Sequence, residues 1–361
     1  MNESFDIAIV GSGAAGIAAA VTAARAGRKT ILLDKNSAPG GTGGFSGLTT
    51  LCGLFDDSGN FLNDGFAREF AEAITEGAPR LMGKVWVALY RPETFRKRAA
   101  HFFAEAGVQT HFNCAVADVI VENNRIARLN GFAVGAVIDG SGSAEVARLI
   151  GAECLATDET TQASAVVFTL RCVTRPLDSI ADAAQVLLAA TRAGFAPFSF
   201  HPNLEPQSIT VKFSGNAEQV LPLIQFLQKN VRGFEHCESA SDKFQSTPRK
   251  GRMIVGEYLL TGADVLSARK FPDAVARCAW PIEQWNADGR ATFKYLPAGA
   301  HYEIPARSLR AKEIKNLFMA GKTISADTDA IASARVMGCC LATGAAAGVL
   351  AARSLESANT E

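Results

Sequence analysis

The chain has 361 residues, of which 48% are apolar and 20% charged, as in an ordinary globular protein. Lys and Arg together number 36, as do Asp and Glu, so the net charge is zero and neither nucleic acid nor an anionic membrane is expected as a partner. The length is too great for one small core and predicts two domains.

Residues 5–34 have the pattern of a strand, a turn, a helix and a second strand. Phe5–Val10 is a short apolar run, typical of a parallel strand buried on both faces. Ala14–Ala26 is rich in Ala and is followed by Gly27, the usual residue at a helix C-terminus. Thr30–Leu33 predicts the second strand. Residues 7–24 are apolar enough to resemble a membrane span, but their glycines favour this βαβ unit.

The turn after the first strand has the spacing of a dinucleotide-binding fingerprint. Its residues are Gly11, Ser12, Gly13, Ala14, Ala15 and Gly16. The first glycine permits a tight turn, the second lets a pyrophosphate approach the backbone, and the third lets helix and strand pack closely. The helix N-terminus offers free N–H groups to the anion. Asp34, at the end of the second strand, can accept from ribose hydroxyls and disfavours a 2′-phosphate.

A glycine-dense loop is expected over Pro39–Gly53. Its candidate cofactor contacts are Gly40, Gly41, Thr42, Gly43 and Ser46. Flexible backbone just past the second strand suits the far end of a long cofactor, because glycines allow close wrapping. This loop therefore favours FAD over NAD.

Two amphipathic helices and four strands are predicted next. One helix carries Phe66, Phe70 and Ile74 on one face, and the other begins near Pro92. The predicted strands are Val108–Phe112, Ala115–Val121, Ile126–Leu129 and Ala133–Asp139, with a turn at Asn123-Asn124. Gly140-Ser141-Gly142 follows, then a helix over Ala144–Ile150. Because Glu145 stands at the third glycine position, we expect this turn to serve the same FAD rather than a second nucleotide.

The pattern changes after Cys154 and returns near residue 301. Strands are predicted at Ser164–Cys172, Ser208–Phe213 and Met253–Leu260, and helices at Asp178–Ala193 and Asn216–Asn230. The predicted domains are 1–154, an inserted 155–300, and 301–361 completing the first. The last segment has a strand at Asn316–Ala320, then Gly321, then a long Ala-rich helix after Ser333. No GxGxxG occurs in 155–300, so a dedicated NAD(P)H domain is not expected.

Several segments together resemble a known family. They are residues 5–47, Tyr302–Leu309, Asn316–Lys322, Ile324–Ala326, Ala332–Met337 and Ala342–Gly348, with Arg249, Arg252, Gly256, Glu257, Tyr258, Asp264 and Phe271–Asp273 in between. They resemble the FAD-dependent oxidoreductases that include the heterodisulfide reductase flavoprotein subunit and are distant relatives of fumarate reductase flavoproteins. The resemblance implies an α/β fold: a Rossmann-like, glutathione-reductase-type FAD-binding domain with an inserted α+β substrate or cap domain.

The resemblance also implies positions for the cofactor. Pyrophosphate would lie near Gly11–Gly16, the adenosine ribose at Asp34 and its neighbour Lys35, and the flavin along Gly40–Ser46. Val116, Gly140, Gly142 and Gly321 would lie near FAD, and Arg335, Val336 and Met337 would open a helix aimed at the flavin pyrimidine ring. Such a helix N-terminus stabilises reduced flavin. No His stands in Gly40–Gly53 for a covalent link, so the FAD is expected to be non-covalent.

Eight cysteines are present, and their wide spacing fits neither a zinc site nor an iron–sulfur cluster. Free thiols in a reducing cytoplasm are expected. Cys339 and Cys340 are expected to be core residues. Cys52 lies just beyond the glycine loop and is a candidate for electron exchange with the flavin, although a structural thiol is the commoner case. No metal is expected.

The substrate-side candidates are Arg307, Arg335, His301, Tyr302 and Cys52, with Arg249, Arg252 and His201 as further possibilities. Arginines suit a substrate carboxylate, and His301 or Tyr302 could donate a proton beside a hydride transfer. The predicted function is hydride transfer between an organic small molecule and flavin N5. A flavin monooxygenase and an electron-transfer or assembly subunit stay open, as do a homo-oligomer and a redox partner protein.

Overall fold

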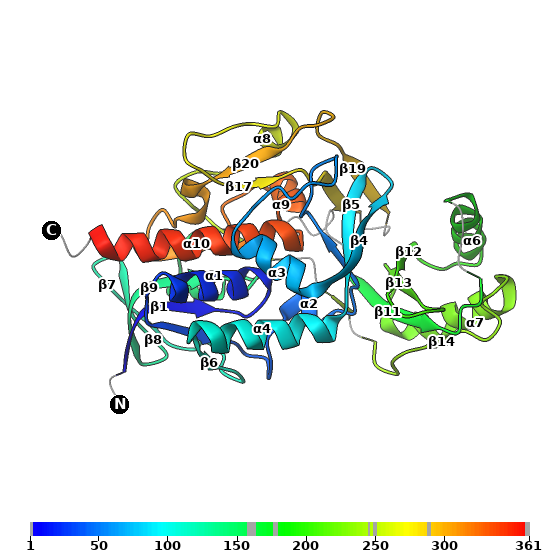
Figure 1. Cartoon of the computed structure of the whole chain (residues 1–361), viewed down its shortest axis with the longest axis horizontal. Helices are drawn as coiled ribbons and strands as arrows, with labels where there is room; N and C mark the ends of the chain where they lie inside the picture. The colour runs from blue at the N-terminus through cyan, green and yellow to red at the C-terminus, as the bar shows by residue number, and fades with distance from the viewer. Residues whose placement is uncertain are drawn as a thin grey trace.

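The computed structural model describes residues 3–156, 164–175, 180–244, 246–247, 251–286 and 290–357. Figure 1 shows a larger part that holds both chain termini and, beside it, a smaller part built from described residues between 165 and 247. The smaller part is a sheet with helices on its outer side. Arg249, predicted as a candidate residue, lies outside the described residues.

The opening unit folds as predicted. β1 (Ser4–Val10) and β2 (Thr30–Leu33) are parallel neighbours, and α1 (Ala14–Arg25) connects them. All of β2 and the last four residues of β1 are buried, as expected inside a parallel sheet. Gly27 has a φ of 78°, which lets the chain leave the helix.

The main sheet is mostly parallel. Its strands are β6 (Gln109–His111), β2, β1, β9 (Phe132–Asp139), β8 (Arg125–Leu129) and β7 (Val119–Glu122) in that order, with β21 (Leu317–Met319) also beside β9. Strands β1 and β9 are adjacent and parallel. Ligands of doubly wound sheets bind at the carboxyl ends of such strands. Here those ends meet Gly11 and Gly140.

Further helices of this part are α3 (Phe66–Ile74), α4 (Pro92–Ala106), α5 (Glu145–Ile150), α9 (Thr328–Ala334) and α10 (Met337–Ser357). Helices α3 and α4 follow the predicted apolar spacing, whereas α9 was not predicted. Gly344 and Gly348 let α10 lie against α1, because a Cβ on Gly348 would stand 2.7 Å from the carbonyl oxygen of Ala19. Among the described residues, Met337–Glu356 is the one helix long and apolar enough to cross a membrane, and 61% of it is buried inside the fold.

Several predicted boundaries differ from the structure. The glycine loop contains a short helix, α2 (Gly41–Phe45), and a strand, β3 (Thr50–Cys52). Two strands were not predicted, β4 (Thr75–Met82) and β5 (Val85–Tyr90), which complete a sheet with β3. Strand β7 starts at Val119, not Ala115, because the Asn130 side chain accepts from the backbone N–H groups of 117 and 118.

The smaller part is a twisted antiparallel sheet backed by helices. Its strands are β11 (Ala165–Arg171), β12 (Phe198–Pro202), β13 (Ile209–Phe213), β14 (Glu238–Ser239) and β15 (Ser246–Thr247), and its helices are α6 (Ile180–Arg192) and α7 (Val220–Asn230). The predicted helix start at Asp178 lies outside the described residues. We call this part the cap.

Two hydrophobic cores are present. The cap core draws its buried residues from Val166–Cys237, whereas residues from Met253 to Ile304 pack into the larger core. The remaining elements belong to that larger part: β10 (Cys154–Ala156), β16 (Arg252–Ile254), β17 (Ala274–Cys278), β18 (Ile282–Trp285), β19 (Ala291–Lys294), β20 (Tyr302–Pro305) and α8 (Gly262–Leu266). The strand predicted at Met253–Leu260 is shorter in the structure, where β16 ends at Ile254. The domain limits at 154/155 and 300/301 stay predictions.

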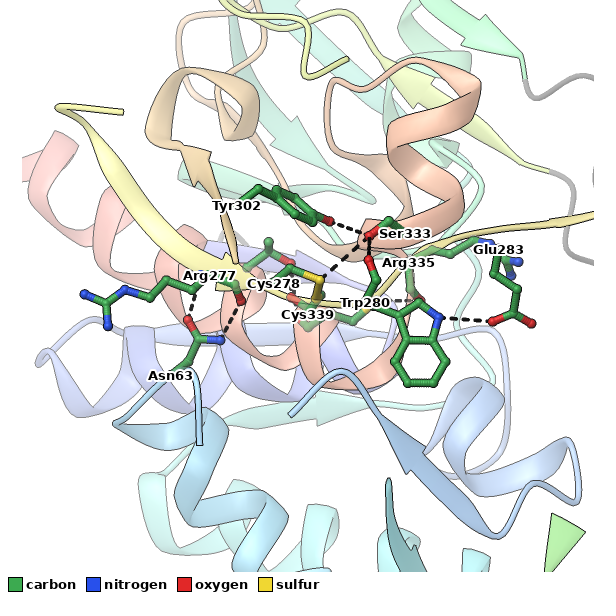
Figure 2. Close-up of a disulfide and its surroundings, with 11 residues drawn as sticks. Asn63, Arg277, Cys278, Trp280, Glu283, Tyr302, Ser333, Arg335 and Cys339 are labelled. Carbon is green, nitrogen blue, oxygen red and sulfur yellow. Dashed lines mark hydrogen bonds between the residues drawn. A yellow bond between two sulfur atoms is a disulfide. The ribbon is translucent and has the colours of Figure 1, made fainter. Parts of the chain in front are cut away.

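The expectation of free thiols is wrong for two cysteines. Cys278 in β17 and Cys339 in the first turn of α10 form a disulfide across 61 positions, with Cα atoms 6.1 Å apart. Both residues are fully buried. Their wide separation in sequence gave no sign of the pairing, which the fold creates by laying α10 against β17 (Figure 2). Cys340 is a buried free thiol, as expected.

Candidate active site

The glycine turn has the geometry of an anion-binding turn. Gly11 has a φ of 93°, and a Cβ there would stand 2.7 Å from the carbonyl oxygen of Gly140. A Cβ on Gly16 would collide with the carbonyl oxygen of Gly11. By contrast, a Cβ on Gly13 would meet nothing within 4 Å. Gly11 and Gly16 thus close the turn, and Gly13 presents open backbone at the N-terminus of α1.

Asp34 is buried at the carboxyl end of β2, and its carboxylate is already bonded. One oxygen accepts from the N–H and the hydroxyl of Ser12, both at 2.6 Å. The other accepts from the backbone and side chain of Asn36 at 2.7 and 2.9 Å. Since each oxygen has two lone pairs, a ribose hydroxyl would replace one of these donors or share with it. Lys35 is exposed, and Val116 lies two residues past Cys114, which donates to the Asp34 carbonyl at 2.8 Å.

The second glycine segment lies directly against the first. The N–H of Gly40 donates to the carbonyl of Ser12 at 2.8 Å, and a Cβ on Gly41 would stand 2.8 Å from the Cα of Gly13. Gly43 and Gly44 are buried in α2, while Thr42 is exposed and Ser46 half-buried. The predicted pyrophosphate and flavin segments are therefore neighbours in space.

The start of α10 joins this segment. Tyr90 is fully buried and donates to the carbonyl of Gly43 at 3.0 Å, with the sulfur of Met337 3.9 Å from the same hydroxyl. A Cβ on Gly53 would collide with the Val336 side chain. The structure thus brings Gly40–Gly53 and Val336-Met337 together, although almost 300 residues separate them in sequence.

Three further predicted positions, Gly140, Gly142 and Gly321, lie around the glycine turn. Gly140 packs on Gly16 and Val10, and its turn is held by the buried Asp139 carboxylate, which accepts from Ser141 and Val146. Gly321 has a φ of 68° and would place a Cβ 2.8 Å from Ala15. Gly142 lies beside the aliphatic stem of Lys322.

Lys322 is a further candidate residue, which the sequence pattern did not indicate. Its Cε would stand 3.6 Å from a Cβ on Gly251, so its stem runs between that glycine and Gly142. Burial and the nearby Arg335 lower the pKa of its ammonium to about 8. The neighbouring glycines and its position after the β21 strand were the available signals.

The catalytic candidates are placed in different surroundings. Arg307 is tied to Asp273 at 3.0 Å on the surface, 5.1 Å from the Tyr258 ring centre. Tyr302 is fully buried, shares a hydrogen bond of 2.9 Å with Ser333, and has its pKa raised by burial. The carbonyl of His301 accepts from Lys270. Tyr302 therefore lies against Ser333 at the end of α9, two residues before Arg335, whereas Arg307 and His301 are bonded to Asp273 and Lys270.

Cys52 and Arg335 lie nearer to the cofactor segments. Cys52 ends β3, and burial together with the charge of Glu283 raises its pKa to about 12. A thiol in this state is inert at neutral pH, which supports a structural role over electron exchange. Arg335 connects α9 to α10, and its Nε is buried without a hydrogen-bond partner.

The cap contributes a polar face that was not predicted. Ser199 pairs with Lys212, and His201 pairs with Thr210, so the four side chains share one face of the sheet. Thr49 bonds Thr210 at 3.0 Å and the carbonyl of Pro202 at 3.0 Å, which turns this face toward the glycine segment. The alternation of polar and apolar residues in 198–202 and 209–213 was the available signal.

The chain belongs to the FAD dependent oxidoreductase family, which matches residues 6–203 and 191–360. The family match, the parallel sheet and its glycine turn together define an FAD-binding flavoprotein of the Rossmann-like class. The family match also supports the prediction that the protein is an enzyme. No curated protein matches the sequence.

Solved structures show the same fold at low sequence identity. A geranylgeranyl bacteriochlorophyll reductase-like protein from Thermoplasma acidophilum is 15% identical with a TM-score of 0.54, over 99% of this chain and 80% of that one. A mutant of the flavin-dependent brominase Bmp2 is 13% identical with a TM-score of 0.54, over 98% and 81%. GidA from Aquifex aeolicus is 13% identical with a TM-score of 0.54, over 98% and 64%. The first two are named for different reactions, a reductase-like protein and a brominase, so the fold alone names no substrate.

The residues present fit FAD. Gly13 leaves open space at a helix N-terminus, where a pyrophosphate would sit, and Lys322 supplies a positive charge beside Gly142. Gly40–Ser46 and the start of α10 would hold the flavin end. Among the described residues, no group of three or more His, Cys, Asp or Glu side chains is placed to bind a metal.

Lys322 should strengthen FAD binding in a pH-dependent way. A pyrophosphate favours the charged ammonium, which is already formed below pH of about 8 in the free protein. As the pH rises above that value the free protein loses this proton, so FAD affinity falls. Titration of the apoprotein with FAD from pH 7 to 9.5, followed by flavin fluorescence, measures this. Lys322→Gln should bind about tenfold more weakly at pH 7 and lose this pH dependence; identical curves for both proteins would contradict the assignment.

Proposed function

We propose that this protein transfers a hydride between an organic small molecule and N5 of a non-covalently bound FAD. One observation carries the proposal: the glycine segment, the start of α10 and the polar face of the cap converge at the carboxyl ends of β1 and β9. When bound, FAD supplies two-electron hydride chemistry at its ring. The chain supplies binding, orientation and charge around it.

The start of α10 would stabilise a reduced ring. Met337 begins the helix and Val336 precedes it, both against the glycine segment, so the unpaired N–H groups and positive dipole end of the helix lie beside the predicted flavin position. Negative charge that develops on the ring would be stabilised there. The cap sheet, fixed by Thr49, would exclude water from the same space.

The test is anaerobic reduction of the FAD-loaded protein by a panel of organic acids, alcohols and amines. The proposal expects at least one compound to bleach the oxidised flavin absorbance without oxygen or NAD(P)H. Bleaching only by NADPH, with oxygen uptake when a substrate is added, would instead indicate a monooxygenase. Activity that appears only in a co-purified complex would indicate an electron-transfer or assembly subunit. Either result would overturn the proposed reaction.

We propose the cytoplasm as the location of this protein. Disulfides are rare in reducing compartments. However, Cys278 and Cys339 are both fully buried, and exchange with a cellular thiol requires access to one sulfur. Alkylation of thiols in freshly lysed cells, followed by mass spectrometry, would show whether this pair is oxidised there.

A further inference from the structure

A cavity of about 330 Å³ lies between the β4–β5 hairpin and the segment that follows β19. Its walls come from four separate segments, 55–57, 84–86, 279–280 and 295–300, so the fold alone assembles it. Aromatic and larger apolar side chains are prominent in its lining, among them Phe55, Trp86, Trp280, Tyr295, Leu296 and Pro297. A volume and a lining of this kind are typical of small-molecule sites.

The cavity has a buried floor and an open rim. Phe55 and Trp280 are each 7% exposed, Trp86 is half-buried, and Tyr295 is 44% exposed. Gly59 lies against the indole of Trp86, because a Cβ there would stand 3.3 Å from the ring. A ligand that enters would therefore meet the exposed ring of Tyr295 first and the buried ring of Trp280 last.

The polar atoms of the two indoles are already bonded. The indole N–H of Trp86 donates to the carbonyl of Asp57 at 3.0 Å. The indole N–H of Trp280 donates to the Glu283 carboxylate at 3.1 Å, as Figure 2 shows. What these side chains offer to a ligand is therefore ring surface, which attracts other aromatic rings beyond the gain from burial.

The charged groups at the rim are engaged as well. The Asp56 carboxylate accepts from the backbone N–H groups of residues 58 and 60 at 2.9 and 2.8 Å. The Asp57 carboxylate accepts from the N–H of Gly299 at 2.5 Å. The ammonium of Lys84 is 5.0 Å from the Tyr295 ring centre. Because both signs of charge stand at the rim and each has its own contacts, a ligand gains little from a charge of its own.

We propose that this cavity binds a neutral, planar aromatic small molecule through the rings of Trp86, Trp280 and Tyr295. The inference goes beyond the hydride transfer proposed above, because it concerns a ligand site and stands whatever reaction the flavin performs. Saturated molecules of the same size would bury similar apolar area but would lack the contacts between rings.

The cavity adjoins the predicted flavin end through Trp280 and Phe55. Trp280 bonds Glu283, which in turn lies 3.4 Å from Lys212 of the cap. Phe55 stands two residues after Gly53, where the chain packs on the start of α10. An aromatic ligand here is thus either part of the substrate or a separate molecule bound beside the flavin, and the experiment distinguishes these two sources.

The experiment titrates the protein, with and without FAD, with 2-naphthalenemethanol and with its saturated counterpart decahydro-2-naphthalenemethanol. Calorimetry measures both affinities and requires no turnover. The aromatic alcohol should bind one to one in both forms of the protein, and the saturated alcohol should bind at least tenfold more weakly. Equal affinities for the two alcohols would overturn the inference. Binding to the FAD-free protein alone would also overturn it, because the ligand would then occupy the cofactor site.

Variants locate the ligand. Tyr295→Leu and Trp86→Leu each remove a ring and keep an apolar side chain, so each should weaken binding about tenfold. Tyr295 is exposed enough that its substitution should leave thermal unfolding unchanged, so this variant decides the matter if Trp86→Leu is unstable. Phe132→Leu is the matched control, because Phe132 is half-buried like Trp86 but lies at the amino end of β9. It should bind the aromatic alcohol as the natural protein does.

Anaerobic mixing with the FAD-loaded protein separates the two sources. Bleaching of the flavin by the bound aromatic alcohol, or by an aromatic compound that competes with it, means that the cavity holds substrate. Binding that leaves the flavin oxidised means that it holds a separate ligand. Both results support the aromatic site.

The outcomes also separate this inference from the proposed function. If panel compounds reduce the flavin but the aromatic alcohol binds equally to Tyr295→Leu, Trp86→Leu and the natural protein, the inference fails and the hydride transfer stands. If the alcohol binds through these rings and no compound reduces the flavin, the aromatic site stands and the proposed reaction fails.

Discussion

Gly13→Ala is expected to leave the apoprotein as stable as before and to weaken FAD binding tenfold to about a hundredfold. The added methyl would meet no atom within 4 Å, and Gly13 has an ordinary φ of −73°, so the fold tolerates it. The methyl would instead fill the space through which a pyrophosphate approaches the backbone. Thermal unfolding of the apoprotein and FAD titration measure the two effects separately.

Gly16→Ala is the contrasting variant. Its methyl would collide with the Gly11 carbonyl, so this change should destabilise the apoprotein itself. If Gly13→Ala bound FAD as tightly as the natural protein, the pyrophosphate would not lie at this turn. A lower melting temperature for apo Gly13→Ala would contradict the open space beside Gly13, because the added methyl would then meet other atoms.

Cys278→Ala is expected to lower the free energy of unfolding by about 4 kcal/mol, because the disulfide closes a loop of 61 residues in the unfolded chain. The same loss should follow reduction of the natural protein under conditions that open the core. The disulfide also ties β17 to the first turn of α10, so its loss should loosen the helix start that faces the predicted flavin. Chemical denaturation with and without reductant measures the change.

Cys237→Ala serves as the control for simple loss of a buried sulfur. Cys237 is a fully buried free thiol in the cap core, and its substitution should cost about 1 kcal/mol and be insensitive to reductant. Non-reducing mass spectrometry that finds both Cys278 and Cys339 alkylated in the unfolded protein would contradict the disulfide.

The fold of the larger part was predictable because its local signals agree. The glycine fingerprint, the apolar strands and the amphipathic faces of α3 and α4 each follow from short-range patterns. The β4–β5 hairpin was missed because β4 is mostly exposed and carries no apolar alternation, although the run Val85–Tyr90 was a usable signal. In the glycine segment, α2 forms where composition favoured a loop.

The candidate site was predictable in its cofactor half and not in its substrate half. Gly11, Gly13 and Gly16 act within one turn, so sequence spacing describes them. Lys212 and Glu283 meet only because the cap folds over β18, and no local pattern encodes that contact. Arg335 and Arg307 were both predicted as substrate-side residues, but Arg307 lies in a surface ion pair. Charge and residue type alone did not separate the two.

The most direct test of the account is reconstitution of the purified apoprotein with FAD. The account predicts a yellow, saturable 1:1 complex with the absorption bands of oxidised flavin, release of unmodified FAD on denaturation, and much weaker binding by Gly13→Ala. A protein that stays colourless after incubation with FAD would contradict the central claim that the turn at Gly11–Gly16 holds this cofactor.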